Sequence, residues 1–428
     1  MKTFLRSALL LGACYGLGIS AAAQFKSLKE ADGKHWFKGQ THTHTLWSDG
    51  DAAPELAVAW YKDHGYDFLS VTDHNTMLRG EKWFIVNDKE RLTNARLAEL
   101  KERFGADWVE TAEAGGELVM RLKTYEELRA RFEEPGKFIL VEGEEITSNA
   151  HVNGINILEK IAPSIAEATR EVIREDFAAV DHQSHTHKKP MIAHLNHPNW
   201  GKLGVPPEDL IAVDTSRFFE VYNGHGGVNN WGDAALFRVP MDRYWDIVLS
   251  VRLAANPENI LYALGTDDAH DYFVRGPGNS IPGRGWCMVL SESLEADAIT
   301  RAFIDGDFYA SAGVMLNAVE WDDKTFRVDI AAEPDVTYTT IFYGTKRGAD
   351  VSSTPTLDAS GMEVPNVARQ YSDQLGAVLL ETKVNPAVYS FTGDELYVRA
   401  KVVSSKLKVD PFKEGDVEMA WTQPAVRK

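Results

Sequence analysis

The segment Thr41-His42-Thr43-His44 carries two histidines two residues apart. In an extended strand such side chains point to the same side, so both imidazoles can bind one ion. Imidazole suits Zn, Mn and Fe ions. The pair alone is weak evidence, because a second such pair, His185-Thr186-His187, lies in a polar stretch that is typical of a solvated loop.

Further histidines and carboxylates follow later strand-like runs. They lie in Thr72-Asp73-His74, Glu142-Gly143-Glu144-Glu145 with His151 close behind, Asn196-His197-Pro198 and Thr266-Asp267-Asp268-Ala269-His270. One carboxylate after a strand is often only a helix cap. Many buried carboxylates repel one another unless cations lie between them. The pattern therefore predicts a site for divalent metal ions.

The elements that must position these residues alternate between strand-like and helical patterns from about residue 36 to about residue 312. This alternation predicts an α/β domain with a central parallel sheet or barrel. The strand candidates are 68–72, 138–141, 191–193, 219–222 and 262–264. In a barrel, the loops at the carboxyl ends of the strands surround one mouth, so ligands that follow strands converge there.

Two segments depart from this alternation. Residues 77–137, rich in Arg, Glu, Leu and Ala, predict two or three amphipathic helices inserted before the next strand, either as a solvated face or as a lid. Residues 314–428 predict a smaller all-β C-terminal domain of sandwich type. That segment contains no histidine, which assigns the metal chemistry to residues 24–313.

The N-terminus has the pattern of a signal peptide. Lys2 and Arg6 precede an apolar run, and Ala21 and Ala23 give an A-x-A cleavage site, so residues 1–23 predict export to the periplasm or the medium. An alternative is a lipoprotein anchored through Cys14. In either case Cys287 has no partner for an intrachain disulfide in the mature chain.

The net charge of −18 disfavours binding to nucleic acid or anionic lipid, because no basic block offsets it. Divalent ions reverse the local field, so a phosphorylated small molecule can still bind. Beyond the leader, no run reaches the ~20 apolar residues of a membrane-spanning helix. We expect a small-molecule substrate, and the sequence leaves the oligomeric state open.

The order of these segments resembles the PHP (polymerase and histidinol phosphatase) superfamily of metallohydrolases, closest to its carbaryl-hydrolase-like branch. The resemblance covers roughly Trp36 to Gly313 and rests on H-x-H with S-D-G, T-D-H, G-x-E, H-P and D-x-H in that order. It implies a distorted (β/α)7 barrel, two or three divalent ions (Mn, Zn or Fe) and hydrolysis of phosphoesters.

Nine residues match the ligand positions of that pattern. The resemblance implies these metal ligands: His42, His44, Asp49, His74, Glu145, His151, His197, Asp268 and His270. Glu145 corresponds to the bridging glutamate, and Glu145, Asp268 and His270 are the expected catalytic residues. Glu144, His194 and Asp267 compete with their neighbours Glu145, His197 and Asp268.

The mechanism expected from these ligands needs no serine or cysteine nucleophile. Two neighbouring ions lower the pKa of a shared water and polarise an ester oxygen. Asp49, His74 and His270 would hold a further ion that stabilises the leaving oxygen. Asp73 could orient the ring of His74, although it could equally be a helix cap.

The substrate contacts are predicted from position alone. Arg275 and Arg284 lie in a Gly- and Pro-rich loop after the last ligands and could bind phosphate oxygens. His225 ends a strand on the same side, while Trp47 and Trp200 flank ligand segments and could form an aromatic wall or belong to the core.

Three functions fit these observations. The first is an exported phosphoesterase that acts on a phosphomonoester or a phosphodiester. The second is a hydrolase of a carbamate, amide or carboxylic ester. The third is a non-catalytic binding protein with a structural metal, which the large ligand set disfavours because structural sites are usually single and closed.

Overall fold

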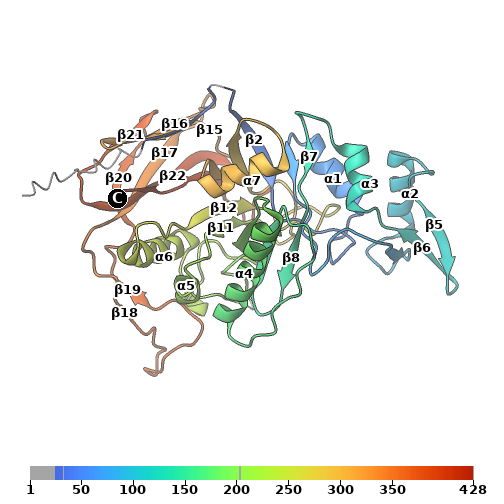
Figure 1. The fold of residues 1–428 in the computed structure, drawn as a ribbon, viewed down its shortest axis with the longest axis horizontal. Helices are drawn as coiled ribbons and strands as arrows, with labels where there is room; N and C mark the ends of the chain where they lie inside the picture. The colour runs from blue at the N-terminus through green and yellow to red at the C-terminus, as the bar shows by residue number, and fades with distance from the viewer. Residues whose placement is uncertain (1–24, 32, 202–203, 428) are drawn as a thin grey trace, which may run out of the picture.

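The computed structural model describes residues 25–31, 33–201 and 204–427 (Figure 1). The predicted signal peptide, with Cys14, lies outside the described residues. Cys287 is buried with a free thiol. No helix within the described ranges is long and apolar enough to cross a membrane.

The predicted α/β region contains two sheets of mixed direction. One has the order β12-β11-β10-β9-β8, in which β12, β11 and β10 pair in parallel and β9 pairs antiparallel with both β10 and β8. In the other, β2, β3 and β7 run parallel, and β13 and β14 are added antiparallel beyond β2. The strands are β2 (His35–Gln40), β3 (Phe68–Leu69), β7 (Ile139–Leu140), β8 (Gly143–Thr147), β9 (His151–Ile155), β10 (Ile192–Leu195), β11 (Phe218–Asn223), β12 (Tyr262–Thr266), β13 (Trp286–Ser291) and β14 (Phe308–Ser311).

Two isolated bridges join these sheets at the carboxyl ends of their strands. Thr43 pairs with Ala269, and His74 pairs with Glu145, both in the parallel sense. Backbone hydrogen bonds support them: His44 N–H donates to Ala269 O at 2.9 Å, and Asn75 N–H donates to Glu145 O at 2.8 Å. The segments after β2, β3 and β12 therefore meet β8 in one place, although the described strands form two open sheets and the closed seven-stranded barrel stays a prediction.

Helices cover these sheets. They are α1 (Pro54–Asp63), α4 (Thr169–His187), α5 (Pro207–Ile211), α6 (Met241–Ala255) and α7 (Ala296–Asp305), with the short 3-10 helix η1 (Ala234–Leu236). The apolar side chains of α4 and α6 pack with those of β10 and β11 in one buried cluster that includes Phe177, Trp245, Leu195 and Phe219.

The insertion at 77–137 is only partly helical, which corrects the prediction of helices alone. It holds α2 (Asn94–Phe104) and α3 (Tyr125–Phe132), together with a small antiparallel sheet of β4 (Trp83–Ile85), β6 (Glu117–Arg121) and β5 (Thr111–Ala114). Gly115 and Gly116 both have positive φ and link β5 to β6 as a two-residue hairpin turn. Figure 1 shows α2, β5 and β6 at the end of the molecule farthest from the C-terminal strands.

After β14 the described chain forms strands and connecting segments without a helix. Its strands are β15 (Leu316–Trp321), β16 (Thr325–Ile330), β17 (Tyr338–Lys346), β18 (Ser353–Thr354), β19 (Gln370–Tyr371), β20 (Ala377–Thr382), β21 (Ala387–Ser390), β22 (Glu395–Leu407), β23 (Val417–Thr422) and β24 (Ala425–Val426). One sheet, β1-β15-β16-β21, begins with the N-terminal strand β1 (Lys26–Lys29). The other contains β17, β20 and β22. Phe326 and Phe342 pack between the two sheets, with their ring centroids 5.7 Å apart.

The C-terminal strands continue the sheet of the preceding region. β23 pairs with β14, which pairs with β13 and through it with β2. One ten-stranded sheet therefore contains strands from both sides of the predicted domain boundary at residue 313. Hydrogen bonds between backbones run across it without a break.

A buried group of charged side chains also ties α6 to β22. We call Asp242, Asp246, Tyr397, Arg399 and Lys401 the Arg399 cluster. Arg399 is fully buried and donates Nε–H and Nη2–H to the two carboxylate oxygens of Asp246, at 2.8 and 2.6 Å. Its third donor reaches Asp242 at 3.1 Å, and Lys401 donates to the other oxygen of Asp242 at 2.6 Å.

Candidate metal centre

The structure brings all nine predicted ligands together. Their nitrogen and oxygen atoms form four overlapping groups, each with its atoms within 4.8 Å of one another: His44/Asp49/His74/His270, His42/Glu145/His197, His42/His44/Asp268 and His74/Glu145/His151. We call these nine residues the metal centre. Most are buried, whereas the side chain of Asp49 is 53% exposed and opens the centre to solvent.

Each ligand except Asp49, which lies in the loop between β2 and α1, is on a strand or within five residues of the end of one. His42 and His44 follow β2 and stay on one side of the chain, as the spacing predicts. Glu145 lies on β8, His151 begins β9, and His197 follows β10. Asp268 and His270 follow β12. The convergence predicted from strand ends is therefore what the backbone provides.

Glu145 lies at the middle of the metal centre. Its Oε1 is 3.0 Å from His151 Nδ1 and 3.4 Å from His42 Nε2. Its Oε2 is 2.7 Å from His74 Nδ1 and 3.2 Å from His44 Nε2. A single carboxylate thus contacts histidines of all four groups, which is the position a bridging ligand requires.

Asp268 and Asp49 contact the histidines of the metal centre from positions other than that of Glu145. Asp268 Oδ1 lies 3.3 Å from His42 Nε2 and 3.2 Å from His44 Nε2. Asp49 lies 3.2 Å from His270 Nε2 and 3.5 Å from His74 Nε2. The carboxylates and imidazoles alternate around a common centre.

Several buried polar atoms of the metal centre have no hydrogen-bond partner. They are His42 Nε2, His44 Nε2 and Glu145 Oε2. Buried polar atoms are nearly always satisfied, so three converging orphans indicate a ligand that they share. Imidazole nitrogens mixed with carboxylates suit Zn, Mn or Fe ions, and the residues therefore fit divalent metals.

The charges depend strongly on one another. Burial lowers the pKa of His42, but the carboxylates of Asp268, Glu220 and Glu145 outweigh it and raise that pKa well above its usual value. Burial raises the pKa of Glu145, yet the nearby histidines, first His74 and then His42, hold it well below the usual value. Without metal, protonated histidines thus supply the positive charge that stabilises the carboxylates.

Two ligands have a backbone conformation that L-residues rarely adopt. His197 has φ +29° and Asp268 has φ +50°. Such conformations cost roughly 1–3 kcal/mol each and persist only where the surroundings impose them. Their presence at two ligands supports a functional site.

Glu144, Asp267 and His194, the three residues that competed with predicted ligands, are not part of the metal centre. Glu144 points away from Glu145 and accepts a hydrogen bond from Ile161 N–H. Asp267 accepts N–H groups from Gly283, Arg284 and Gly285, so it anchors a loop. His194 is buried 3.8 Å from Glu220 and belongs to none of the four groups.

Asp73 and the second histidine pair have roles that the sequence did not predict. Asp73 accepts from Thr45 N–H at 2.8 Å and from the Ser48 hydroxyl at 2.6 Å, so it orders the loop after His44 and does not orient His74. Thr147 contacts His74 Nδ1 instead, at 2.7 Å. His185 and His187 end helix α4, not a loop, and do not join the metal centre.

Neither arginine predicted to bind substrate faces the metal centre. Arg275 is exposed and pairs with Asp410 of the C-terminal segment. Arg284 is fully buried, and its five donor contacts all end on backbone carbonyl oxygens, those of Gly224, Gly276, Asn279, Asp410 and Pro411. A guanidinium whose donors are all engaged is not available for a phosphate, so Arg284 is a structural link.

The rim of the metal centre carries His225 and Trp200. The ring of His225 lies 5.2 Å from that of His270, and burial lowers its pKa to about 4, so the ring is neutral. Trp200 lies 5.5 Å from the rings of both His151 and His197. Trp47 is instead buried in the core, where its Nε1–H donates to Lys123 O.

Glu220 is a residue of the site that the sequence reasoning missed. It is fully buried on β11, and its Oε1 lies 2.7 Å from His42 Nδ1. The signal was a lone acidic residue inside the apolar run Phe218-Phe219-Glu220-Val221-Tyr222. A buried carboxylate in such a run needs a partner.

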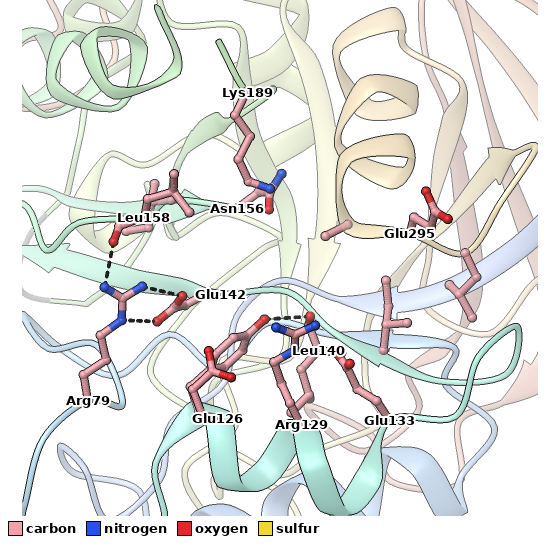
Figure 2. A pocket seen from close by; sticks show the side chains of 15 residues that line it. Arg79, Glu126, Arg129, Glu133, Leu140, Glu142, Asn156, Leu158, Lys189 and Glu295 are labelled. Atoms are coloured by element: carbon pink, nitrogen blue, oxygen red, sulfur yellow. Dashed lines mark hydrogen bonds and ion pairs between the residues drawn. The ribbon is translucent and has the colours of Figure 1, made fainter. Parts of the chain in front are cut away.

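A separate pocket of about 430 Å³ lies between α3, the segments around β7 and β9, and the start of α7 (Figure 2). Its cations already have partners. Arg79 forms a forked pair with Glu142 and donates to Leu158 O, Arg129 pairs with Glu133, and Lys189 pairs with Asp297. None of the nine ligands lines it.

Comparisons with known proteins give only distant similarities. No family model and no curated protein matches the chain. A search of solved structures finds a two-domain protein from Bacteroides vulgatus that contains a predicted PHP-like metal-dependent phosphoesterase. It is 15% identical, with a TM-score of 0.40, and the match covers 94% of this chain and 97% of that one.

A second solved structure is a candidate metal-dependent phosphoesterase from Bifidobacterium adolescentis. It is 13% identical, with a TM-score of 0.27, over 62% of this chain and 95% of that one. TM-scores below 0.5 do not establish a shared fold. The function proposed below therefore rests on the geometry of the metal centre.

Proposed function

We propose that this protein is a PHP-type metal-dependent hydrolase that cleaves a phosphomonoester or a phosphodiester. The observation that carries the proposal is the convergence of nine histidine and carboxylate ligands on Glu145, with orphaned buried atoms pointing inward. The distorted barrel belongs to the same proposal, as do export through the N-terminal leader and a small-molecule substrate.

The residues of the metal centre have different roles in the proposed reaction. Bound ions would lower the pKa of a water molecule and polarise an ester oxygen. Glu145 would hold two ions at a fixed separation, because its two oxygens face different histidines. His270 belongs to the half-open group that contains Asp49, and Asp268 lies beside it, where the leaving oxygen could reach solvent.

Hydrolysis of a carbamate, amide or carboxylic ester is the second candidate. It is favoured by the loss of Arg275 and Arg284 as phosphate ligands, since a neutral carbonyl substrate needs no guanidinium. A non-catalytic binding protein is the third, and the half-open group around Asp49 argues against it because structural metal sites are closed.

The test combines elemental analysis with a substrate panel. Purified protein should contain two or three equivalents of Mn, Zn or Fe and should hydrolyse nitrophenyl phosphate or bis-nitrophenyl phosphate. Glu145→Ala should lose metal and at least about a thousandfold in kcat/KM. The matched control is Glu144→Gln, which changes a buried glutamate that faces away.

Each result decides between the candidates. Cleavage of nitrophenyl acetate or a carbamate without cleavage of either phosphate would select the second function. Metal-loaded protein that cleaves no ester would select the binding protein. Full metal content and activity in Glu145→Ala would contradict the assigned site.

A further inference from the structure

From a single buried position, Glu220 contacts two of the nine ligands, His42 and His197, and also Asn223, which contacts a third ligand. Its Oε1 binds His42 Nδ1 at 2.7 Å. Its Oε2 accepts the backbone N–H of His197 at 2.7 Å and the side-chain amide of Asn223 at 2.8 Å. The same Asn223 amide also reaches Asp268 Oδ2 at 3.2 Å.

The local backbone explains how two side chains of one strand reach the same side. Glu220 and Asn223 are three residues apart, so regular alternation would place them on opposite faces of the sheet. The pairing of β11 with β12 shifts register between Glu220 and Tyr222. A bulge of this kind re-aims side chains, and such bulges occur beside active sites.

The contact with His42 fixes the protonation of its ring. A carboxylate can only accept, so His42 must carry its proton on Nδ1. In the neutral ring, the form that binds metal, Nε2 then has an unprotonated lone pair, and that atom is one of the buried orphans facing Glu145 and Asp268. A carboxylate behind a ligand histidine also raises the basicity of the ring.

The contact with His197 acts on the backbone. His197 has φ +29°, and its N–H is held by Glu220. One carboxylate thus orients the ring of His42, restrains the strained backbone of His197 and, through Asn223, positions Asp268. These three ligands define the two groups that contain His42.

We propose that Glu220 is a positioning residue that sets the metal affinity of the two groups containing His42, and does not support the His44/Asp49/His74/His270 group, which shares only His44 with them. The proposal rests on the metal centre of the proposed function, but not on which ester is cleaved. Glu220 makes no ion pair with Asp49, His74 or His270 in the described residues, which is why the effect should be selective.

Glu220→Gln tests this with little change of shape. Glutamine offers one acceptor oxygen where the site needs two. If that oxygen faces His42, the amide N–H₂ meets the donors of His197 and Asn223. If it faces His197, the amide donates to His42 Nδ1 and moves the ring proton to Nε2, which blocks metal binding there.

The measurement is calorimetric titration of metal-free, full-length protein with Mn²⁺ and with Zn²⁺. We expect Glu220→Gln to weaken the sites that use His42 about 10- to 100-fold. Asp49→Asn should weaken the remaining site instead, and so assign the two classes of site. Glu144→Gln, another buried glutamate changed in the same way, should titrate as the wild type does.

The outcomes separate this proposal from the proposed function. Unchanged affinities in Glu220→Gln, or loss of the same class in Glu220→Gln and Asp49→Asn, would overturn it. If Glu220→Gln does not fold, Asn223→Ser removes the link to Asp268, together with the side-chain contacts to Glu220 and to the backbone N–H of His225, and should give a smaller loss in the same class. Protein that binds metal in this pattern but cleaves no ester would refute the enzyme and leave the inference intact.

Discussion

The metal centre and the Arg399 cluster both bury charged side chains from several elements, yet they satisfy those charges in opposite ways. In the Arg399 cluster, the charged groups that meet Asp242 and Asp246 are the cations Arg399 and Lys401. In the metal centre, the ionisable groups that meet the three carboxylates are histidines, with no Arg or Lys among their ion pairs in the described residues, and buried nitrogen and oxygen atoms stay unpaired.

This difference separates a structural role from a functional one. A buried group that is complete without a ligand holds the fold together. A buried group that is incomplete requires something from outside the chain, here cations. Four experiments can break or sharpen this contrast, and they follow from the largest expected effect to the smallest.

Arg399→Met should cause the largest loss of stability. It leaves Asp246 and Asp242 buried without their main partner, which typically costs about 3–5 kcal/mol. Urea unfolding monitored by fluorescence measures the change, and Arg103→Met, which removes an exposed pair with Asp63, should cost less than about 1 kcal/mol. An equally small loss of unfolding free energy in both variants would show that the Arg399 cluster does not stabilise the fold.

Adding metal should stabilise the protein through the metal centre alone. A ligand that binds only the folded state contributes about 3 kcal/mol at a hundredfold excess over its Kd. We expect Mn²⁺ or Zn²⁺ to raise the Tm of chelator-treated protein, and to do so equally in Arg399→Lys. The Tm of Glu145→Ala should barely respond; a full response there would place the ions elsewhere.

The pH dependence of metal-free protein should also differ between the two regions. Despite burial, carboxylates raise the pKa of His74 to about 11, first through Glu145, and that of His270 to about 9, first through Asp49. Both lie above the unfolded value near 6.5, so their stabilisation is complete below pH 6.5 and is lost as the pH rises toward 9 and beyond.

The expected result is a metal-free protein that is less stable at pH 9.5 than at pH 6.5. Metal-loaded protein should lose less, because cations replace the protons. Arg399 adds no titration in this range, since Asp246 and Asp242 raise its pKa above its already high value against the effect of burial. Denaturant midpoints at the two pH values, with and without metal, measure the effect, and a flat profile without metal would contradict it.

Arg275→Ala should have the smallest effect. The side chain pairs with Asp410 at the surface and does not touch the metal centre, so we expect a change of less than about 0.5 kcal/mol in stability. The kcat/KM toward the best ester of the panel should stay within about twofold. A tenfold loss would restore Arg275 as a substrate ligand.

The parts that the sequence predicted are those with a local signal. Histidines and carboxylates after apolar runs predicted the segments of the metal site, because the ends of neighbouring strands meet in any such sheet, and the resemblance to the PHP pattern assigned the nine residues within and beside them. Glu145 was preferred to Glu144 because Gly143-x-Glu145 matches the G-x-E motif of that pattern. The β-rich C-terminal segment followed from its turns and alternating runs.

The parts that the sequence did not predict depend on long-range pairing or on a turn whose signal was passed over. The Gly115-Gly116 hairpin was readable but was hidden by the helix-forming composition around it. Arg284 was assigned to substrate because nothing local shows that five distant carbonyl oxygens surround it. Glu220 acquires its meaning only through His42, 178 residues away.

The pairing of β23 with β14 bears on how this protein can be divided. A fragment that stops at residue 313 would lack the strand that covers β14, and Arg284 would lose the carbonyl oxygens of Asp410 and Pro411. An uncovered strand edge invites association between molecules. The C-terminal segment is therefore not an exchangeable module, and we expect truncated protein to aggregate before its chemistry can be assayed.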